Sequence, residues 1–503
     1  MRKLSRWTFP FIAQCLVLSI CPSGIAQNSQ VRWDATGWID DLHMVRQALL
    51  TKYANLQWLT EDRQVDLDAL FADTEARVRA SGSDAGARAA FDRLVRKIND
   101  AHVVLDWPKA PGQSIADEVM QQDAPGLCAA VGYEDEPSAS GVVTSLPGYE
   151  RLAASQIFHA GTVPVDGHRV GVLRIGVFLP NRKLCVDAVQ RLKVPARLPC
   201  GASCQEAIDK YAYTAMTKAL EDDLRTLQSL GAEALFIDLT NNGGGSEWAE
   251  VVARMITSKQ LVSEQFGYVR GPHWQKQWAD LAANLTAFAK SAALPDRARL
   301  NEWVAEASRA AQESAKNCSL QNATCTWLGR TGYASGLVKQ ANSREFSDKP
   351  WGKLVFSPAE FTYSDSLWTK PVIILVDQGT ASAAEEFAAI LQDNRAAIIV
   401  GSRTLGAGCG YTNGGTPTSL PRTGATLKVP DCARFRADGT NEVNGVLPDL
   451  SIPWRRDDGI RFKARLLEMH LPSLIEQLRS GESGPIPSSP RRPKKADGAA
   501  HTN

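Results

Sequence analysis

Hydrophobic positions in the N-terminal part of the chain recur with a helical period. Phe91, Leu94, Val95 and Ile98 are spaced i, i+3, i+4 and i+7, which places them on one face of a helix. Residues from about 34 to 101 are predicted to be helical. The chain is therefore expected to begin its folded part with a helical domain.

Further along, unbroken apolar runs predict buried strands. These runs occupy residues 169–178, 234–239, 372–376 and 397–401. Two of them lead through turns of small residues into helical patterns at 247–256 and 383–392. Strand–turn–helix repeats of this kind need parallel crossover connections, so they predict an α/β core. The Ala-rich helical pattern at 273–316 is expected to be an insertion or a cap.

Composition adds a broad class to this pattern. The 503 residues are 44% hydrophobic and 22% charged, which is ordinary for a globular protein with a large core. The net charge of +1 gives no reason to expect nucleic acid as a partner. The Ser- and Pro-rich end, residues 480–503, is predicted to be a disordered tail.

The N-terminus has the pattern of a secretory signal peptide. Basic residues precede an apolar run at 9–21, and the small residues Gly24 and Ala26 follow it. We predict cleavage after Ala26, so that residues 1–26 are removed and the protein is periplasmic or secreted. The run is too short for a good membrane span. A lipoprotein signal ending at Cys21 is the second interpretation.

Export changes the interpretation of the cysteines. Ten occur in total and two lie in the predicted signal, which leaves eight. An even number in an oxidising compartment indicates disulfides. Sequence does not determine the pairing, but three local pairs are plausible staples: Cys200–Cys204, Cys318–Cys325 and Cys409–Cys432. A zinc site is the rival hypothesis, but paired C-x-x-C spacing and a histidine cluster are lacking, so no metal or cofactor is expected.

The stretch "GTASAAEE", residues 379–386, is the first candidate for chemistry. Ser382 lies where a buried strand turns into a helix. Backbone N–H groups there have no partner within the helix, and the helix dipole favours an anion. The amide of Ala383 could therefore stabilise an oxyanion beside a serine nucleophile. A simple helix cap is the commoner role of such a serine.

Two further features could complete a site. The glycine-rich loop "TNNGGGS", residues 240–246, exposes the amides of Gly243 and Gly244 after a buried strand, and such a loop can cradle an anion. It lacks the P-loop pattern, and a plain turn is the alternative. His102 lies in "NDAH" at a predicted helix-to-strand junction, where an imidazole can face a cleft or simply cap a helix.

Several motifs together resemble the tail-specific protease family, peptidase family S41, which includes C-terminal processing peptidases and the tricorn core protease. "FIDLTNNGGGS", "GTASAAEE", "TLGAG" and "NGVLPD" occur in family order within about residues 169–455. The resemblance implies a ClpP/crotonase-like α/β catalytic core with an N-terminal helical domain and a helical insertion. It also implies a serine-type peptidase that acts on polypeptides.

One departure from the family pattern bears on the mechanism. In the C-terminal processing branch a lysine in the turn activates the serine, but "TLGAG" has Ala407 at that place. A Ser–Lys dyad is thereby excluded unless another lysine, such as Lys428, reaches the site. The resemblance then favours the tricorn-like branch, in which a histidine and a late glutamate assist the serine. The matching residues are His102 and Glu442, although an isolated glutamate is more often a surface charge.

The resemblance assigns roles and boundaries. Ser382 would be the nucleophile, His102 the general base, and Glu442 the group that orients the imidazole, with Ala383 and Gly243 or Gly244 as the oxyanion hole. A homodimer is possible. A non-catalytic carrier of apolar ligands, or a scaffolding protein of the same fold, is the rival function. The expected domains are a helical domain (27–107), a linker or degenerate PDZ-like module (108–168), and a catalytic core (169–460) with its insertion at about 262–350.

Overall fold

The computed structural model describes residues 33–108, 123–135, 141–194, 200–316, 318 and 326–480. The predicted signal peptide lies outside these residues, and so does the predicted tail beyond Ser480. Cys325, one half of a predicted disulfide, also lies outside them.

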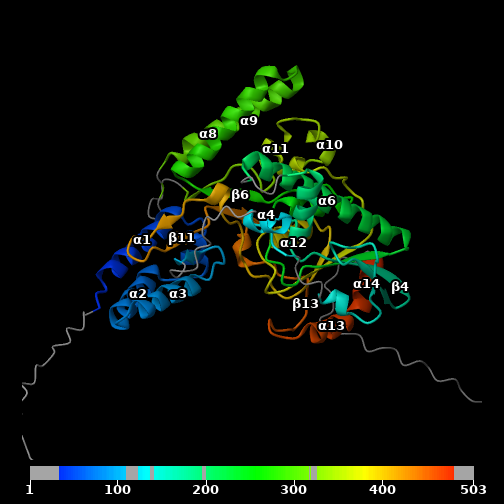
Figure 1. The fold of residues 1–503 in the computed structure, drawn as a ribbon, viewed down its shortest axis with the longest axis horizontal. Helices are drawn as coiled ribbons and strands as arrows, with labels where there is room; N and C mark the ends of the chain where they lie inside the picture. Colours follow the sequence, from blue (N-terminus) through cyan, green and yellow to red (C-terminus); the bar gives the residue numbers. More distant parts are fainter. Residues whose placement is uncertain are drawn as a thin grey trace, which may run out of the picture.

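A seven-stranded sheet forms the centre of the larger part of the molecule (Figure 1). Its order is β13-β9-β8-β5-β4-β3-β2, and the strands from β4 to β13 pair in parallel. The bounds are Glu150–Arg151 (β2), Gly161–Val165 (β3), His168–Arg174 (β4), Ala234–Asp238 (β5), Val372–Val376 (β8), Ile398–Gly401 (β9) and Leu450–Ser451 (β13). The α/β core is confirmed. The described part of 108–168 supplies β2 and β3, which extend this sheet.

Side chains of successive strand residues point to opposite faces of the sheet. Both faces are buried, because a hydrophobic core lies on each of them. On β5, Leu235 and Ile237 enter one core, and Phe236 enters the other. The first core is covered by the helices Arg182–Arg191 (α5), Ala202–Ser229 (α6), Trp248–Met255 (α7) and Ala383–Asp393 (α12). The second is covered by the helices Ile460–Glu468 (α13) and Leu471–Ser480 (α14). Unbroken apolar strands are what such two-sided burial requires.

The N-terminal helices form the helical domain expected from the sequence, and two small sheets connect it to the core. The helices are Thr36–Lys52 (α1), Leu67–Ser81 (α2) and Asp84–Ile98 (α3). One small sheet joins Val104–Asp106 (β1), Thr426–Lys428 (β11) and Thr418–Ser419 (β10). The other joins Cys432–Phe435 (β12), Gln265–Val269 (β6) and Leu328–Gly329 (β7). A chain segment from near residue 100 thereby lies beside segments from beyond residue 400.

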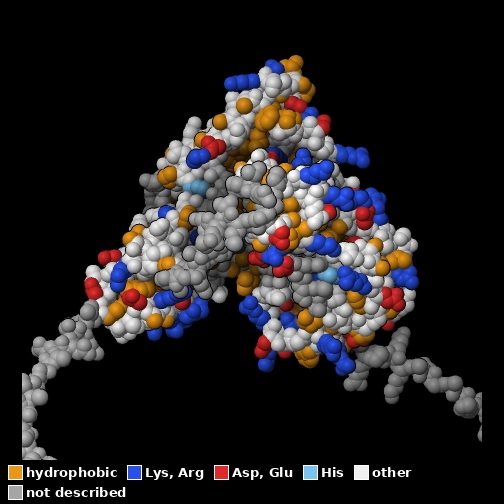
Figure 2. All heavy atoms as spheres, in the orientation of Figure 1, with side chains coloured by type: hydrophobic (Ala, Val, Ile, Leu, Met, Phe, Trp, Pro, Cys, Tyr) orange, Lys and Arg blue, Asp and Glu red, His pale blue; other side chains and the backbone are white. Residues whose placement is uncertain are grey.

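The predicted helical insertion is a hairpin of two long helices, Pro272–Ser291 (α8) and Leu294–Ser314 (α9). It projects from the top of the molecule in Figure 1, and Figure 2 shows apolar side chains along it. The shorter helices are Ala124–Ala130 (α4), Ser343–Phe346 (α10) and Gly352–Val355 (α11). No helix in the described ranges is long and apolar enough to cross a membrane.

Three disulfides are formed between described cysteines. Two of them, Cys200–Cys204 and Cys409–Cys432, are the predicted local pairs. The third, Cys128–Cys185, ties α4 to α5, and the sequence did not suggest it.

Candidate active site

Ser382 lies at a sharp turn between β8 and α12. Its backbone angles are φ 55° and ψ −123°, whereas a residue that merely caps a helix has β-region angles. A non-glycine residue in this region is strained by about 1–3 kcal/mol, and such strain concentrates at functional sites. The carboxylate of Glu385 accepts the Ser382 N–H at 2.9 Å and helps to hold this conformation. The bond to Glu385 is part of a capping box, so Ser382 caps α12, but its strained backbone is not needed for a cap and supports the nucleophile hypothesis.

The glycine-rich loop packs directly against the serine. A Cβ atom at Gly244 would lie 2.7 Å from the Cβ of Ser382 and 3.0 Å from the nitrogen of Ala383, and Gly244 has φ +110°. Only glycine fits there. The Gly244 N–H donates to the side-chain oxygen of Asn242 at 2.8 Å, so it is already occupied. In the described structure the N–H groups of Gly243 and Ala383 have no hydrogen-bond acceptor, so these two are the candidate oxyanion donors.

Three contacts hold His102 in place. Its Nδ1 lies 2.9 Å from the carbonyl oxygen of Ala407. Its backbone N–H donates to Asp100 at 2.9 Å, and the hydroxyl of Tyr411 donates to its carbonyl oxygen. A Cβ at Gly410 would lie 3.2 Å from Nε2, so glycine leaves room for the ring. With Nδ1–H donating to Ala407, the free electron pair of the neutral imidazole is on Nε2.

Glu385 connects the turn that carries Ala407 to the serine. Besides the Ser382 N–H it accepts Thr404 Oγ1 at 2.5 Å, Gly406 N at 2.6 Å and Ala407 N at 2.8 Å. Burial, followed by the charge of Glu442, raises the pKa of Glu385 to about 7, although these hydrogen bonds lower it. The residue in the lysine position of the family thus contributes its backbone: its N–H binds Glu385 and its carbonyl binds His102.

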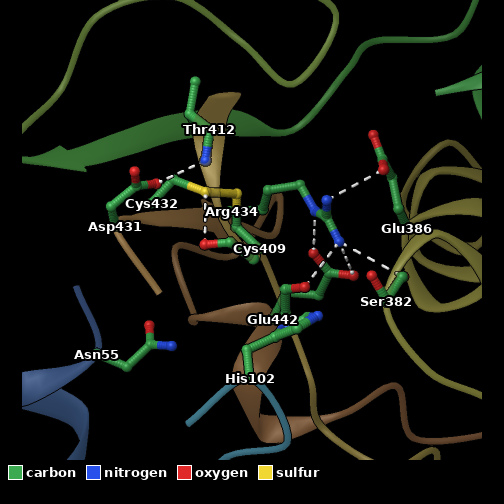
Figure 3. The surroundings of a disulfide bond; sticks show 12 residues. Asn55, His102, Ser382, Glu386, Cys409, Thr412, Asp431, Cys432, Arg434 and Glu442 are labelled. Atoms are coloured by element: carbon green, nitrogen blue, oxygen red, sulfur yellow. Dashed lines mark hydrogen bonds and ion pairs between the residues drawn. A yellow bond between two sulfur atoms is a disulfide. The ribbon is translucent and has the colours of Figure 1, made fainter. Parts of the chain in front are cut away.

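Glu442 is buried and contacts an arginine. Its two carboxylate oxygens accept Nε and Nη2 of Arg434, the latter at 3.1 Å. Figure 3 shows Arg434 in the middle of Glu442, Glu386 and Ser382, with His102 below Glu442 in this view. No hydrogen bond between Glu442 and His102 is present among the described residues; the carbonyl of Ala407 occupies Nδ1 instead. The assignment of Ser382, His102 and Glu442 to catalysis stays a prediction.

A group of buried carboxylates surrounds Arg434. Glu386 lies 3.1 Å from its Nη1, and Glu264 lies 3.6 Å from its Nε. Burial raises the pKa of Glu386 to about 8, although the charge of Arg434 lowers it. Burial, and then the charge of Glu442, also raise the pKa of Glu264 well above its usual range. These carboxyl groups share too little positive charge for all of them to ionise easily.

Lys428, the lysine that could have activated Ser382 in place of the residue at position 407, is bound elsewhere. Lys428 is on β11 and forms an ion pair with Asp106 of β1 at 2.7 Å. It is therefore engaged in the small sheet.

As for metals, no cluster of three or more His, Cys, Asp or Glu in the described residues could hold an ion.

Comparison with known proteins decides the family. The profile of Peptidase family S41 matches residues 207–452. The chain belongs to peptidase family S41. The match covers the glycine-rich loop, Ser382, the "TLGAG" turn and Glu442, while His102 lies before it. S41 members are serine-type peptidases, and the ClpP-like catalytic core expected from the sequence is confirmed.

Individual relatives share short segments of this S41 chain. An uncharacterized protein of Chlamydia muridarum is 35% identical over 96 residues, which is 19% of this chain and 16% of that protein. A carboxyl-terminal-processing protease of Synechocystis is 54% identical over 39 residues, 8% of this chain and 9% of that protein. The chain thus aligns with less than a fifth of the length of either relative.

The solved structure of mature CPAF matches far more of the fold. It covers 90% of this chain and 99% of the CPAF chain with a TM-score of 0.55, at 17% sequence identity. The likeness therefore concerns the fold.

Proposed function

We propose that this S41 protein is an exported serine endopeptidase that cleaves polypeptides through an acyl-enzyme. The observation that carries the proposal is the strained backbone of Ser382, next to which the N–H groups of Ala383 and Gly243 have no acceptor in the described structure. A cap would not need this conformation, whereas a nucleophile with an oxyanion hole does.

These positions support the following mechanism. Ser382 Oγ attacks the scissile carbonyl carbon while His102 Nε2 takes its proton, and the new oxyanion is bound by the two N–H groups. The C–N bond then breaks as His102 gives the proton to the leaving amine. Water hydrolyses the acyl-enzyme by the same route. The carbonyl of Ala407 fixes the tautomer that leaves Nε2 free, and this is the orienting role first expected of Glu442.

Glu442 remains in the proposal with a different task. Its negative charge, held in place by Arg434, would favour the imidazolium that forms when His102 accepts the proton.

The three disulfides between described cysteines support export to an oxidising compartment. The N-terminal signal pattern supports the same location.

The test is substitution of Ser382 by Ala, with Ser419→Ala as a control because Ser419 is exposed on β10. Casein hydrolysis should fall by about 10⁴-fold or more in the first variant and stay unchanged in the second. A fluorophosphonate probe should label the native protein and the control at Ser382 only. A native protein that neither cleaves casein nor is labelled would support the rival function, a carrier or scaffold.

A further inference from the structure

Arg434 is an unusual residue to find beside a nucleophile. It is on β12 and only 8% exposed. Burial of a guanidinium is costly unless its donors are bonded. The identity of its partners therefore shows what the arginine does in the fold.

The partners come from three separate segments, and each segment carries one proposed functional group. Nη2 donates to the carbonyl of Ser382 at 3.4 Å and to that of Gly408, next to Ala407, at 3.2 Å. Nε and Nη2 together bind Glu442. A single planar group thus bridges the nucleophile, the turn that orients His102, and the late glutamate (Figure 3).

The backbone of the serine is held from both sides. Glu385 binds its N–H at 2.9 Å, and Arg434 reaches its carbonyl oxygen, which also accepts the N–H groups of Glu385 and Glu386. A residue with φ 55° needs such constraint to stay in place. Because the N–H of Ala383 belongs to the same peptide group as this carbonyl, movement of the carbonyl also moves an oxyanion donor.

We propose that Arg434 is a positioning residue: its guanidinium fork aligns the Ser382 peptide, the Ala407–Gly408 turn and Glu442 for acyl transfer. This inference rests on the proposed peptidase function. Its alternative is a purely structural role, in which Arg434 only neutralises the buried carboxylates. The two roles differ because alignment needs several donors in fixed directions, whereas neutralisation needs only a positive charge.

The first test is Arg434→Lys, which keeps the charge and loses the fork. The matched control is Arg436→Lys. Arg436 pairs with Asp393 and Glu264 in the same buried group, and within the described residues it forms no hydrogen bond with Ser382 or Gly408. We expect kcat to fall about 100-fold in Arg434→Lys with KM nearly unchanged, the size of effect that misplacement of reacting groups causes. The control should keep kcat. Equal kcat in both variants would overturn the proposal.

A second test separates alignment from folding. Arg434→Gln removes a positive charge and leaves carboxylates unbalanced, so that variant can be too unstable to assay. The double variant Arg434→Gln/Glu264→Gln also removes one of the buried carboxyl groups that faced the arginine, without restoring the fork. We expect its melting temperature to recover toward that of the native protein while kcat stays low. Recovery of kcat together with stability would show a structural role and overturn the inference.

The pH dependence of fluorophosphonate labelling is a third test. The groups that face Arg434 and can titrate are the carboxylates of Glu264, Glu386 and Glu442, with Glu385 and Asp393 close behind them and Arg436 as the other cation. A misaligned site should show low labelling of Ser382 by the fluorophosphonate across the whole pH range. If instead labelling returns to the native rate at some pH, charge rather than alignment is the cause and the inference fails. Failure of the proposed function is distinct: the native protein itself would then be inactive and unlabelled.

Discussion

At the scale of single residues, the site depends on backbone groups as much as on side chains. The carbonyl of Ala407 orients His102, and the proposed oxyanion donors are backbone N–H groups. Glu385 holds this arrangement together because its carboxylate accepts four donors. An alanine can therefore replace the lysine of related enzymes without leaving a gap: its peptide group connects Glu385 to the histidine.

Glu385→Gln should lower stability by about 1–3 kcal/mol, because an amide nitrogen would face N–H donors that it cannot accept. The pKa of Glu385 in the native protein, about 7, lies above the ordinary 4.5. The native state thus keeps a proton that the unfolded chain loses, so this group's contribution makes the protein less stable as pH rises from about 4.5 to 7. Urea unfolding at several pH values should show that the difference between native protein and variant shrinks over this window. A difference that does not depend on pH would contradict the assignment.

Sequence reasoning could find Ser382 because a strand–turn–helix junction is a local pattern. It could not find Arg434, which is 52 residues from Ser382 in the chain and meets it only through the packing of β12. The available signal was weak: an arginine in a short apolar strand, two residues after a cysteine. Likewise, the sequence offered Gly243 and Gly244 as equal donors, and only the Asn242 contact distinguishes them.

At the scale of elements, the apolar runs predicted the central strands to within a few residues, since buried parallel strands have a strong local signal. The expected 372–376 strand matches β8, and the expected 383–392 helix differs from α12 by one residue. The strands β10, β11 and β12 were missed. They are only two to four residues long and are stabilised by pairing with distant segments, so no local pattern marks them.

The Cys409–Cys432 disulfide should matter for activity as well as for stability. It closes a loop of 23 residues and joins the turn after Ala407 to the strand that carries Arg434. The double substitution Cys409→Ser/Cys432→Ser should lower the free energy of unfolding by about 3 kcal/mol and should lower kcat. The control, Cys200→Ser/Cys204→Ser, removes a disulfide at the start of α6 and should leave kcat unchanged. Equal losses of kcat in the two variants would contradict this prediction.

At the scale of the whole molecule, the residues of the candidate site come from two parts of the fold. His102 follows α3 of the helical domain, whereas Ser382 begins α12 on the central sheet (Figure 1). One hydrophobic core contains residues of α1 to α3 together with Leu427 of β11, Ala433 of β12 and Val443 of the short helical turn Glu442–Asn444. The helical domain is therefore expected to unfold together with the strands that position the catalytic turn.

Leu94→Ala tests this coupling far from the site. Leu94 is on α3 and 1% exposed in the shared core, so its truncation should cost about 2–5 kcal/mol. Because the late strands rely on the same core, tryptophan fluorescence and peptidase activity should be lost at one lowered temperature. Arg93→Ala, an exposed change on the same helix, should shift stability by less than about 0.5 kcal/mol. If fluorescence instead reports a first transition that leaves activity intact, the helical domain unfolds alone, and His102 must be held by the contacts of Ala407 and Tyr411 without help from the helices.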